Sequence, residues 1–241
     1  MCFTINIHTT RNAIEKRFNT DGSTLNNFHF HYLYRAFENP LIPVIAQDDP
    51  ARIQLMQWGL IPSWAHDPVH AGMIRKGTYN ARSESIRTKP SFKQSVKNRR
   101  CLIIACGFFE WQHHGKQKIP WYIHHKDQAL LAFAGVYDQW ENPENSDVVQ
   151  TFSIITTRAN PLMEKIHNTK KRMPVLLPEN QEQQWIDQSL SEKEADNLLL
   201  PMDEQQLNAY SVTNGISKPE YDRTSSTTLN KVDYPVEGTL F

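Results

Sequence analysis

Cys101-Leu-Ile-Ile-Ala-Cys-Gly-Phe-Phe109 is the longest apolar run of the chain. Its side chains are apolar at odd and even positions alike, as in a strand that is buried on both faces. The run therefore predicts a central strand of a sheet. Glu110 and Trp111 follow directly. Because burial disfavours the charged form of a carboxylate, we expect Glu110 to exchange protons at neutral pH. The alternative is a glutamate at a strand end that faces water.

Strand-like segments outnumber helical ones along the rest of the chain. The expected strands cover residues 2–8, 43–46, 53–58, 101–109, 121–125, 130–136, 151–156 and 174–177. The expected helices cover residues 11–18, 91–98, 161–166 and 179–200, the last broken near Ser189. Strands and helices do not alternate regularly, so we predict an α+β fold with a curled, barrel-like, mostly antiparallel sheet. No linker or repeat divides the 241 residues, which predicts a single domain with a partly irregular tail over residues 218–241.

The composition is that of a globular protein, with 39% hydrophobic and 22% charged residues. The apolar runs are too short to span a membrane, and the N-terminus lacks the pattern of a secretory signal. Three cysteines without metal-type spacing favour a reducing compartment over a disulfide framework. We therefore expect a cytoplasmic protein that does not enter the membrane.

Charges are segregated although the formal net charge is zero. From Arg75 to Arg100, nine basic residues accompany the single acid Glu84. From Glu179 to Glu204, eight acidic residues accompany one lysine. The basic segment predicts binding of an anion such as a phosphate backbone. A solvated basic surface is the alternative.

The second residue is a cysteine, and removal of Met1 would give Cys2 a free amine beside its thiol. An aldehyde would first form a Schiff base with the amine, and the thiol would then close a thiazolidine ring. Alternation along the first predicted strand places Phe3, Ile5 and Ile7 on the core face and Cys2 on the other, towards a polar surface or cleft. The alternative is an inert cysteine in the core.

Four further residues are candidates for binding or proton transfer. Trp64 lies in a loop-like turn that begins at Trp58, where an exposed ring could stack on a nucleobase. A core position is the alternative for both tryptophans. Asn80 and Arg82 lie in the basic segment, where phosphates would bind. His167 follows the helix predicted at 161–166 and could carry a proton or interact with the helix end.

Metal binding is not expected. The pairs His29/His31 and His66/His70 have suitable spacing, but neither has an evident third and fourth ligand. The sequence has no Gly-rich phosphate loop and no Gly-x-Ser-x-Gly motif.

These segments together resemble the SRAP family (SOS response-associated peptidases), abasic-site processing proteins that form covalent crosslinks with DNA. The matching pieces occur in the family's order: Met1-Cys2, residues 58–64, 80–84, 107–111, 166–167 and 172–174. The resemblance implies a compact α+β domain with a barrel-like sheet and a basic groove for single-stranded DNA. It implies a role in DNA damage and repair, without a cofactor, for which a monomer suffices.

The resemblance also implies a mechanism. Processed Cys2 would attack the ring-opened aldehyde of an abasic site in single-stranded DNA, form a thiazolidine and so protect the lesion. Glu110 would manage protons on the amine and sugar and help the crosslink to reverse. His167 would be a general acid and base on the sugar hydroxyls, and Asn80 would orient the nucleophile or the sugar.

For DNA binding, the resemblance implies that Arg82 holds a flanking phosphate and that Trp64 contacts the bases beside the lesion. Trp58 and Arg172 are the other two residues expected to bind DNA. Removal of Met1 makes the family peptidase-like, and the Schiff base allows strand cleavage by a lyase reaction. The chain departs from the family in two places. Phe3-Thr4 replace the usual Gly-Arg, and Arg172 follows His167 by five residues instead of two.

Two other functions remain open from the residues themselves. The first is an amidohydrolase or peptidase that uses Cys2 as an N-terminal nucleophile on an amide substrate. The second is a noncovalent module that binds single-stranded DNA through the basic segment and Trp64.

Overall fold

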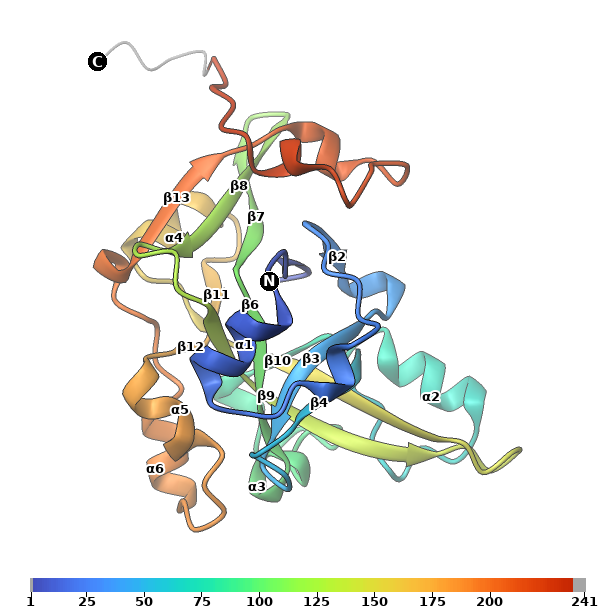
Figure 1. The fold of residues 1–241 in the computed structure, drawn as a ribbon. Helices are drawn as coiled ribbons and strands as arrows, with labels where there is room; N and C mark the ends of the chain where they lie inside the picture. Colours follow the sequence, from blue (N-terminus) through green and yellow to red (C-terminus); the bar gives the residue numbers. More distant parts are fainter. Residues whose placement is uncertain (1, 236–241) are drawn as a thin grey trace.

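The computed structural model describes residues 2–235, and its centre is a closed five-stranded barrel (Figure 1). The barrel strands, in sheet order, are β10 (Val148–Arg158), β4 (Ile53–Trp58), β3 (Leu41–Ala46), β6 (Arg100–Ala105) and β9 (Leu131–Glu141), and β9 pairs again with β10. Neighbours are antiparallel except β4 and β10. Three short strands extend this sheet: β5 (Asn80–Arg82) and β11 (Arg172–Pro174) on β10, and β12 (Leu176–Leu177) on β9. The predicted α+β fold with a barrel-like sheet is confirmed.

A second sheet of five strands stands at one end of the barrel, uppermost in Figure 1. Its strands, in order, are β13 (Leu207–Ser211), β8 (Gln117–His125), β7 (Gly107–His114), β1 (Thr4–Asn6) and β2 (Tyr34–Arg35). All four pairings are antiparallel. The N-terminal strand β1 thus lies inside a sheet, between β7 and β2, and this holds the first residues of the chain at the centre of the molecule.

The apolar run 101–109 is not one strand, as predicted, but the junction of the two sheets. It divides at Cys106, whose N–H donates to the carbonyl of Asn6 at 2.8 Å. Gly107 then passes so close to β8 that a Cβ atom would lie 2.6 Å from the carbonyl oxygen of Ile123. Both halves of the run are buried because each is central in its own sheet, and Cys106 between them is partly buried. Glu110 consequently lies within β7, opposite Trp121, and not at a strand end.

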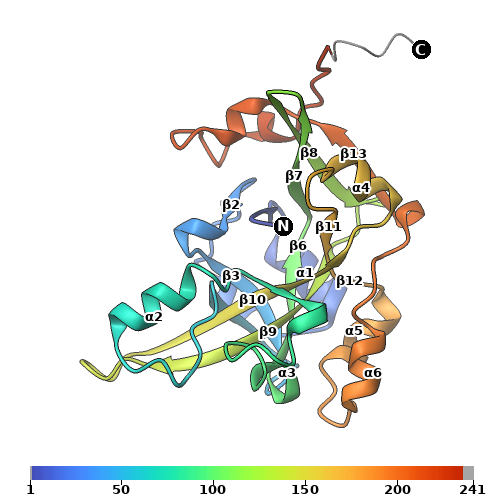
Figure 2. The same cartoon turned by 180° about the vertical axis from the view of Figure 1, so that it is seen from behind.

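The helices follow the prediction in part. Those expected at 11–18 and 161–166 are α1 (Arg11–Phe18) and α4 (Pro161–Ile166). The region 91–98 is helical only in α3 (Ser95–Asn98), and 179–200 is divided into α5 (Glu179–Trp185) and α6 (Glu192–Asn197). The sequence analysis missed α2 (Pro68–Arg75), although Asp67 and Pro68 supply its N-cap and first residue. In Figure 2, α2 lies on one side of the barrel, and α5 and α6 lie on the other.

The segregated charges meet in the fold. Arg100 is fully buried, and its guanidinium donates to the carbonyls of Trp185 at 2.7 Å and Asp187 at 2.6 Å. Arg87 contacts Asp196 of α6 at 2.8 Å. Part of the basic segment therefore holds the acidic segment against the barrel, and only the remainder can serve a ligand.

The C-terminal segment packs on the second sheet. From residue 218 to 235 it contains one 3-10 helix (Ser226–Leu229) and an isolated bridge between Val212 and Lys231, and is otherwise irregular. The rest of the predicted tail, residues 236–241, lies outside the described residues. No helix between residues 2 and 235 has the length and apolar character needed to cross a bilayer.

Candidate functional site

Cys2 is fully buried, which corrects the predicted orientation of the first residues. β1 begins only at Thr4, so the alternation does not extend back to Cys2 and Phe3. Phe3 is half-buried and lines two clefts, whereas the Cys2 thiol lies inside the protein and points to the carbonyl of Thr4 at 3.9 Å. Burial raises the pKa of the Cys2 thiol well above its usual value, and the negative charge of Glu110 raises this pKa further. The thiol is therefore protonated at neutral pH.

Asn80 is directly connected to Cys2. Its side-chain Nδ2 donates to the Cys2 carbonyl oxygen at 2.9 Å, although 78 residues separate the two. Asn80 belongs to β5, which pairs with β10 in the barrel wall, so the hydrogen bond ties the N-terminus to a rigid element. The side-chain Oδ1 of Asn80 is buried, and within residues 2–235 it has no hydrogen-bond partner. This carboxamide holds Cys2 with one atom and has an acceptor left for another group.

A cleft of about 730 Å³ lies beside Cys2 and contains Glu110 and His167. Glu110 comes from β7 and His167 from the end of α4, and both side chains are buried to more than nine-tenths. Basic side chains line the same cleft: Arg35, Lys118 and Lys170. The structure thus brings together the carboxylate and the imidazole proposed for proton transfer.

The five-residue spacing between His167 and Arg172 forms a closed loop. The Nδ1 atom of His167 lies 2.8 Å from the carbonyl oxygen of Arg172 and 3.3 Å from its backbone nitrogen. A carbonyl oxygen can only accept, so the shorter contact favours a proton on Nδ1 and leaves Nε2 as the basic nitrogen of the neutral ring. Thr169 and Lys170 of this loop line the cleft. The longer loop therefore adds residues to the cleft and keeps His167 in it.

A second cleft of about 540 Å³ shares Phe3 with the first and carries three residues of the basic segment. Lys76, Arg82 and Lys89 line it together with Asn80, and none of its lining residues between positions 2 and 235 is acidic. All three cations are exposed. The two clefts meet at Phe3, next to Cys2.

Trp58 is in the core and has no exposed surface. Its indole N–H donates to the carbonyl of Tyr79 at 2.9 Å, one residue before Asn80. Gly59 follows with φ of +105°, and a Cβ atom there would lie 2.9 Å from the Tyr79 ring. Trp58 therefore positions the strand that carries Asn80 and does not reach a ligand itself.

Trp64 and Arg172 stand apart from the two clefts' linings. Trp64 is about half exposed and lies against His70 of α2, with ring centroids 5.7 Å apart. Arg172 forms an ion pair with Glu84, and one of its nitrogens donates to the carbonyl of Thr156 at 2.6 Å. Arg172 thus fixes the strand that follows the His167 loop, whereas Trp64 keeps about half of its surface exposed outside the clefts.

Sequence reasoning missed an aromatic cluster beside Cys2. The rings of Phe3 and Phe37 stack with centroids 4.9 Å apart, and Tyr79 packs edge-on against both. Phe37 is 64% exposed. Its sequence surroundings, between β2 and β3, carry no motif that would have identified it.

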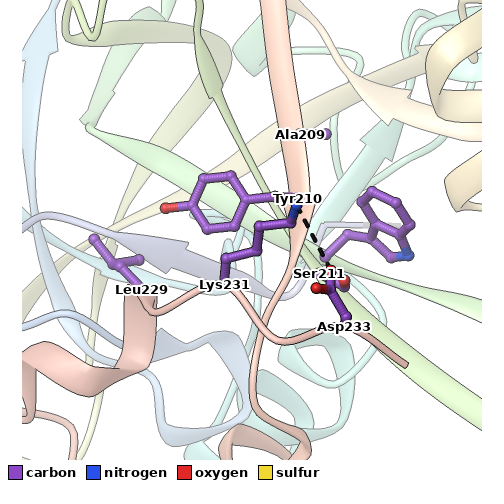
Figure 3. Close-up of a pocket in the computed structure, with 7 residues that line it drawn as sticks. Ala209, Tyr210, Ser211, Leu229, Lys231 and Asp233 are labelled. Atoms are coloured by element: carbon purple, nitrogen blue, oxygen red, sulfur yellow. Dashed lines mark ion pairs between the residues drawn. The ribbon is translucent and has the colours of Figure 1, made fainter. Parts of the chain in front are cut away.

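A further cavity of about 570 Å³ lies along β13, the edge strand of the second sheet (Figure 3). Tyr210 and Trp121 line it, and so do Lys231 and Asp233, which form an ion pair at 3.6 Å. The charges of the two ionic side chains among its described lining residues therefore balance. For residues 2–235, no three His, Cys, Asp or Glu side chains are arranged to hold a metal ion.

Comparison with known proteins gives a consistent result. Residues 1–219 match the family described as SOS response associated peptidase (SRAP). The chain is 34% identical to "Abasic site processing protein YoqW" of Bacillus subtilis, over 91% of this chain and 96% of that protein. It is also 34% identical to "Abasic site processing protein HMCES" of Xenopus tropicalis, over 55% of this chain and 44% of that one. A crystal structure of a protein from Bacteroides thetaiotaomicron, 34% identical, superposes with a TM-score of 0.91 over 96% of this chain and all of that chain. The chain belongs to the SRAP family.

Proposed function

We propose that this protein recognises abasic sites in single-stranded DNA and captures them covalently through Cys2 after Met1 has been removed. The observation that carries the proposal is the hydrogen bond from Asn80 to the Cys2 carbonyl. It holds the N-terminal residue where two clefts meet, one containing Glu110 and His167 and the other lined with cations. The names of the two related proteins quoted above support abasic DNA as the substrate.

The chemistry requires no cofactor. The Cys2 amine attacks C1′ of the ring-opened sugar, and loss of water gives a Schiff base. The thiol sulfur then adds to C1′ while its proton passes to the nitrogen, which closes a thiazolidine. The net reaction joins one aldehyde and one aminothiol and releases one water. The raised pKa of the thiol favours this order, because a protonated thiol is a poor nucleophile and the amine therefore reacts first.

Glu110 and His167 would move the protons of this sequence. Glu110 lines the cleft beside Cys2, and its charge raises the pKa of the Cys2 thiol; it would take the proton that the sulfur releases and pass it to the nitrogen. His167 has Nε2 as the basic nitrogen of its neutral form and lines the same cleft, where it would act on the sugar hydroxyls. The buried Oδ1 of Asn80 would accept a hydrogen bond from the new N–H or from the sugar.

The cations of the second cleft would carry the phosphates on one side of the lesion. Lys76, Arg82 and Lys89 lie on the Asn80 side, and Lys118 and Lys170 lie on the Glu110 side. A strand that passes Cys2 would therefore meet positive charge before and after it. These contacts take the place of the arginine that many relatives have at the position of Thr4.

Two accessory activities follow from the same site. Hydrolysis of the Met1–Cys2 amide, which consumes one water and releases methionine, would prepare the nucleophile and accounts for the peptidase in the family's name. The Schiff base would acidify the C2′ proton of the sugar, and β-elimination would then expel the 3′ phosphate as a lyase does. Trp64 would contact a base farther along the strand.

The test is a denaturing gel of Met1-free protein with single-stranded DNA that carries one abasic site. We expect a heat-stable adduct that requires both the lesion and Cys2, with Cys2→Ala and undamaged DNA as controls. If Cys2→Ala binds abasic and undamaged DNA as the wild type does and no adduct forms, the protein is a noncovalent binding module. Amide hydrolysis by the wild type but not by Cys2→Ser would instead support an amidohydrolase.

A further inference from the structure

The aromatic residues beside Cys2 have no part in the chemistry described so far. Phe3 follows the nucleophile directly and is the residue at which the two clefts meet. Phe37 stacks on Phe3 at 4.9 Å with 29° between the ring planes, and it lines the cleft that contains Glu110. Tyr79, whose carbonyl is held by the indole of Trp58, supports both rings from the side.

Phe37 is unusually exposed for a large apolar side chain. With 64% of its surface accessible, it keeps most of its ring in solvent although Phe3 and Tyr79 are adjacent. An exposed aromatic ring in a concave basic surface is the arrangement with which proteins bind unpaired bases. Every nucleobase has a π-face, so such a ring accepts any base and needs no hydrogen-bonding partner.

The charges around the pair fit the same occupant. Lys76, Arg82 and Lys89 stand on one side of Phe3, and Lys118 and Lys170 on the other. A single strand whose phosphates follow these cations passes over the aromatic pair with its bases unpaired. Double-stranded DNA would keep its bases stacked inside the helix and away from the rings.

We propose that Phe3 and Phe37 form a stacking platform for the base adjacent to the abasic site. The proposal rests on the proposed function, since the lesion must lie at Cys2. An abasic nucleotide has no base of its own, so its neighbour loses one stacking partner in the DNA. Phe37 replaces that stacking partner and so fixes the position of the neighbouring nucleotide. This keeps the aldehyde of the abasic sugar close to the Cys2 amine.

The experiment measures single-turnover crosslinking rates of Met1-free protein with three oligonucleotides. The first carries natural bases on both sides of the abasic site. In the second and third, the 5′ or the 3′ neighbour is a tetrahydrofuran spacer, which has neither a base nor an aldehyde. The proteins are the wild type, Phe37→Ala, Phe37→Trp and the control Leu200→Ala, which removes a similarly exposed apolar side chain outside both clefts.

On the first oligonucleotide we expect Phe37→Ala to react about tenfold more slowly than the wild type, whereas Phe37→Trp and Leu200→Ala retain the wild-type rate. One of the two spacers should slow the wild type by the same factor and leave Phe37→Ala unchanged, because the ring and the base act as one pair. The spacer with this effect identifies the stacked neighbour.

Equal crosslinking rates for Phe37→Ala and the wild type would contradict the stacking platform. So would rate reductions by Phe37→Ala and by the spacer that multiply when the variant reacts with the spacer oligonucleotide. A wild type that forms no crosslink with any oligonucleotide would instead refute the proposed function. Binding of undamaged single-stranded DNA then decides the platform independently, since Phe37→Ala must still bind about tenfold more weakly than the wild type.

Discussion

Asn80→Ala removes the hydrogen bond that carries the proposed function. The bond joins Nδ2 of Asn80 to the Cys2 carbonyl oxygen at 2.9 Å and is the side-chain tie between the N-terminus and the barrel wall. Loss of such a bond, with one partner left in the protein, costs about 1–2 kcal/mol. If that free energy serves to hold Cys2 in its reactive orientation, the rate of crosslinking falls about tenfold, since about 1.4 kcal/mol corresponds to a factor of ten.

The assay compares single-turnover crosslinking of abasic single-stranded DNA by Met1-free proteins at a temperature where all are folded. Asn80→Asp is the second variant, because it keeps the size of the side chain but presents a carboxylate oxygen to the Cys2 carbonyl. We expect it to be at least as slow as Asn80→Ala. The matched control is Gln47→Ala, which removes another carboxamide bonded to backbone atoms, those of Asp187 and Arg100, near α5.

Two results would contradict the reasoning. If folded Asn80→Ala crosslinks as fast as the wild type, Asn80 does not orient the nucleophile. If Gln47→Ala slows the reaction by the same factor, the loss reflects general stability and not the position of Cys2. Thermal unfolding of each variant, measured alongside, shows how much stability each has lost.

Three further predictions concern charge and protonation. Glu110→Gln should slow crosslinking but speed alkylation of Cys2 by iodoacetamide, because removing the carboxylate lowers the raised thiol pKa; parallel changes in the two rates would refute the assigned role. Arg82→Ala should lower the slope of log binding constant against log salt concentration for undamaged single-stranded DNA by about 0.7, which is the contribution of one phosphate contact. Lys97→Ala changes a residue of the same basic segment outside the clefts and should leave this slope unchanged. Burial raises the pKa of Cys101, so the folded thiol stays protonated while the unfolded one ionises above about pH 9, and stability falls as pH rises. The free energy of unfolding is measured by urea titration between about pH 9 and 10.5. For Cys101→Ala it should fall by up to about 1.4 kcal/mol less per pH unit than for the wild type, and an equal pH dependence of the two proteins would contradict the prediction.

Local signals accounted for the elements that the sequence analysis predicted well. The helices 11–18 and 161–166 and the strand 53–58 appear with the predicted bounds. These depend on residue period and capping, which act over a few residues. α2 was missed although the same kind of cap, Asp67 with Pro68, begins it.

Long-range packing decided the features that the sequence analysis had wrong. The run 101–109 has uniform apolar character, and only the pairing of its two halves with different sheets divides it at Cys106. Likewise, alternation could not tell that Cys2 is buried and Phe3 faces the clefts, because their surroundings come from β5, β7 and the segment after β2.

The amino-acid sequence alone defines the chemical groups available to this protein: a cysteine that Met1 removal would make N-terminal, a carboxylate directly after an apolar run, and a basic segment. Residue identity is sufficient for these, because an aminothiol or a guanidinium has the same intrinsic reactivity in any fold. Which of these groups meet depends on the tertiary structure. Asn80 reaches Cys2, His167 shares a cleft with Glu110, and Phe37 stacks beside the nucleophile, across separations of tens of residues. Such contacts arise from closing the barrel and adding β1 to the second sheet, and no short stretch of sequence encodes them.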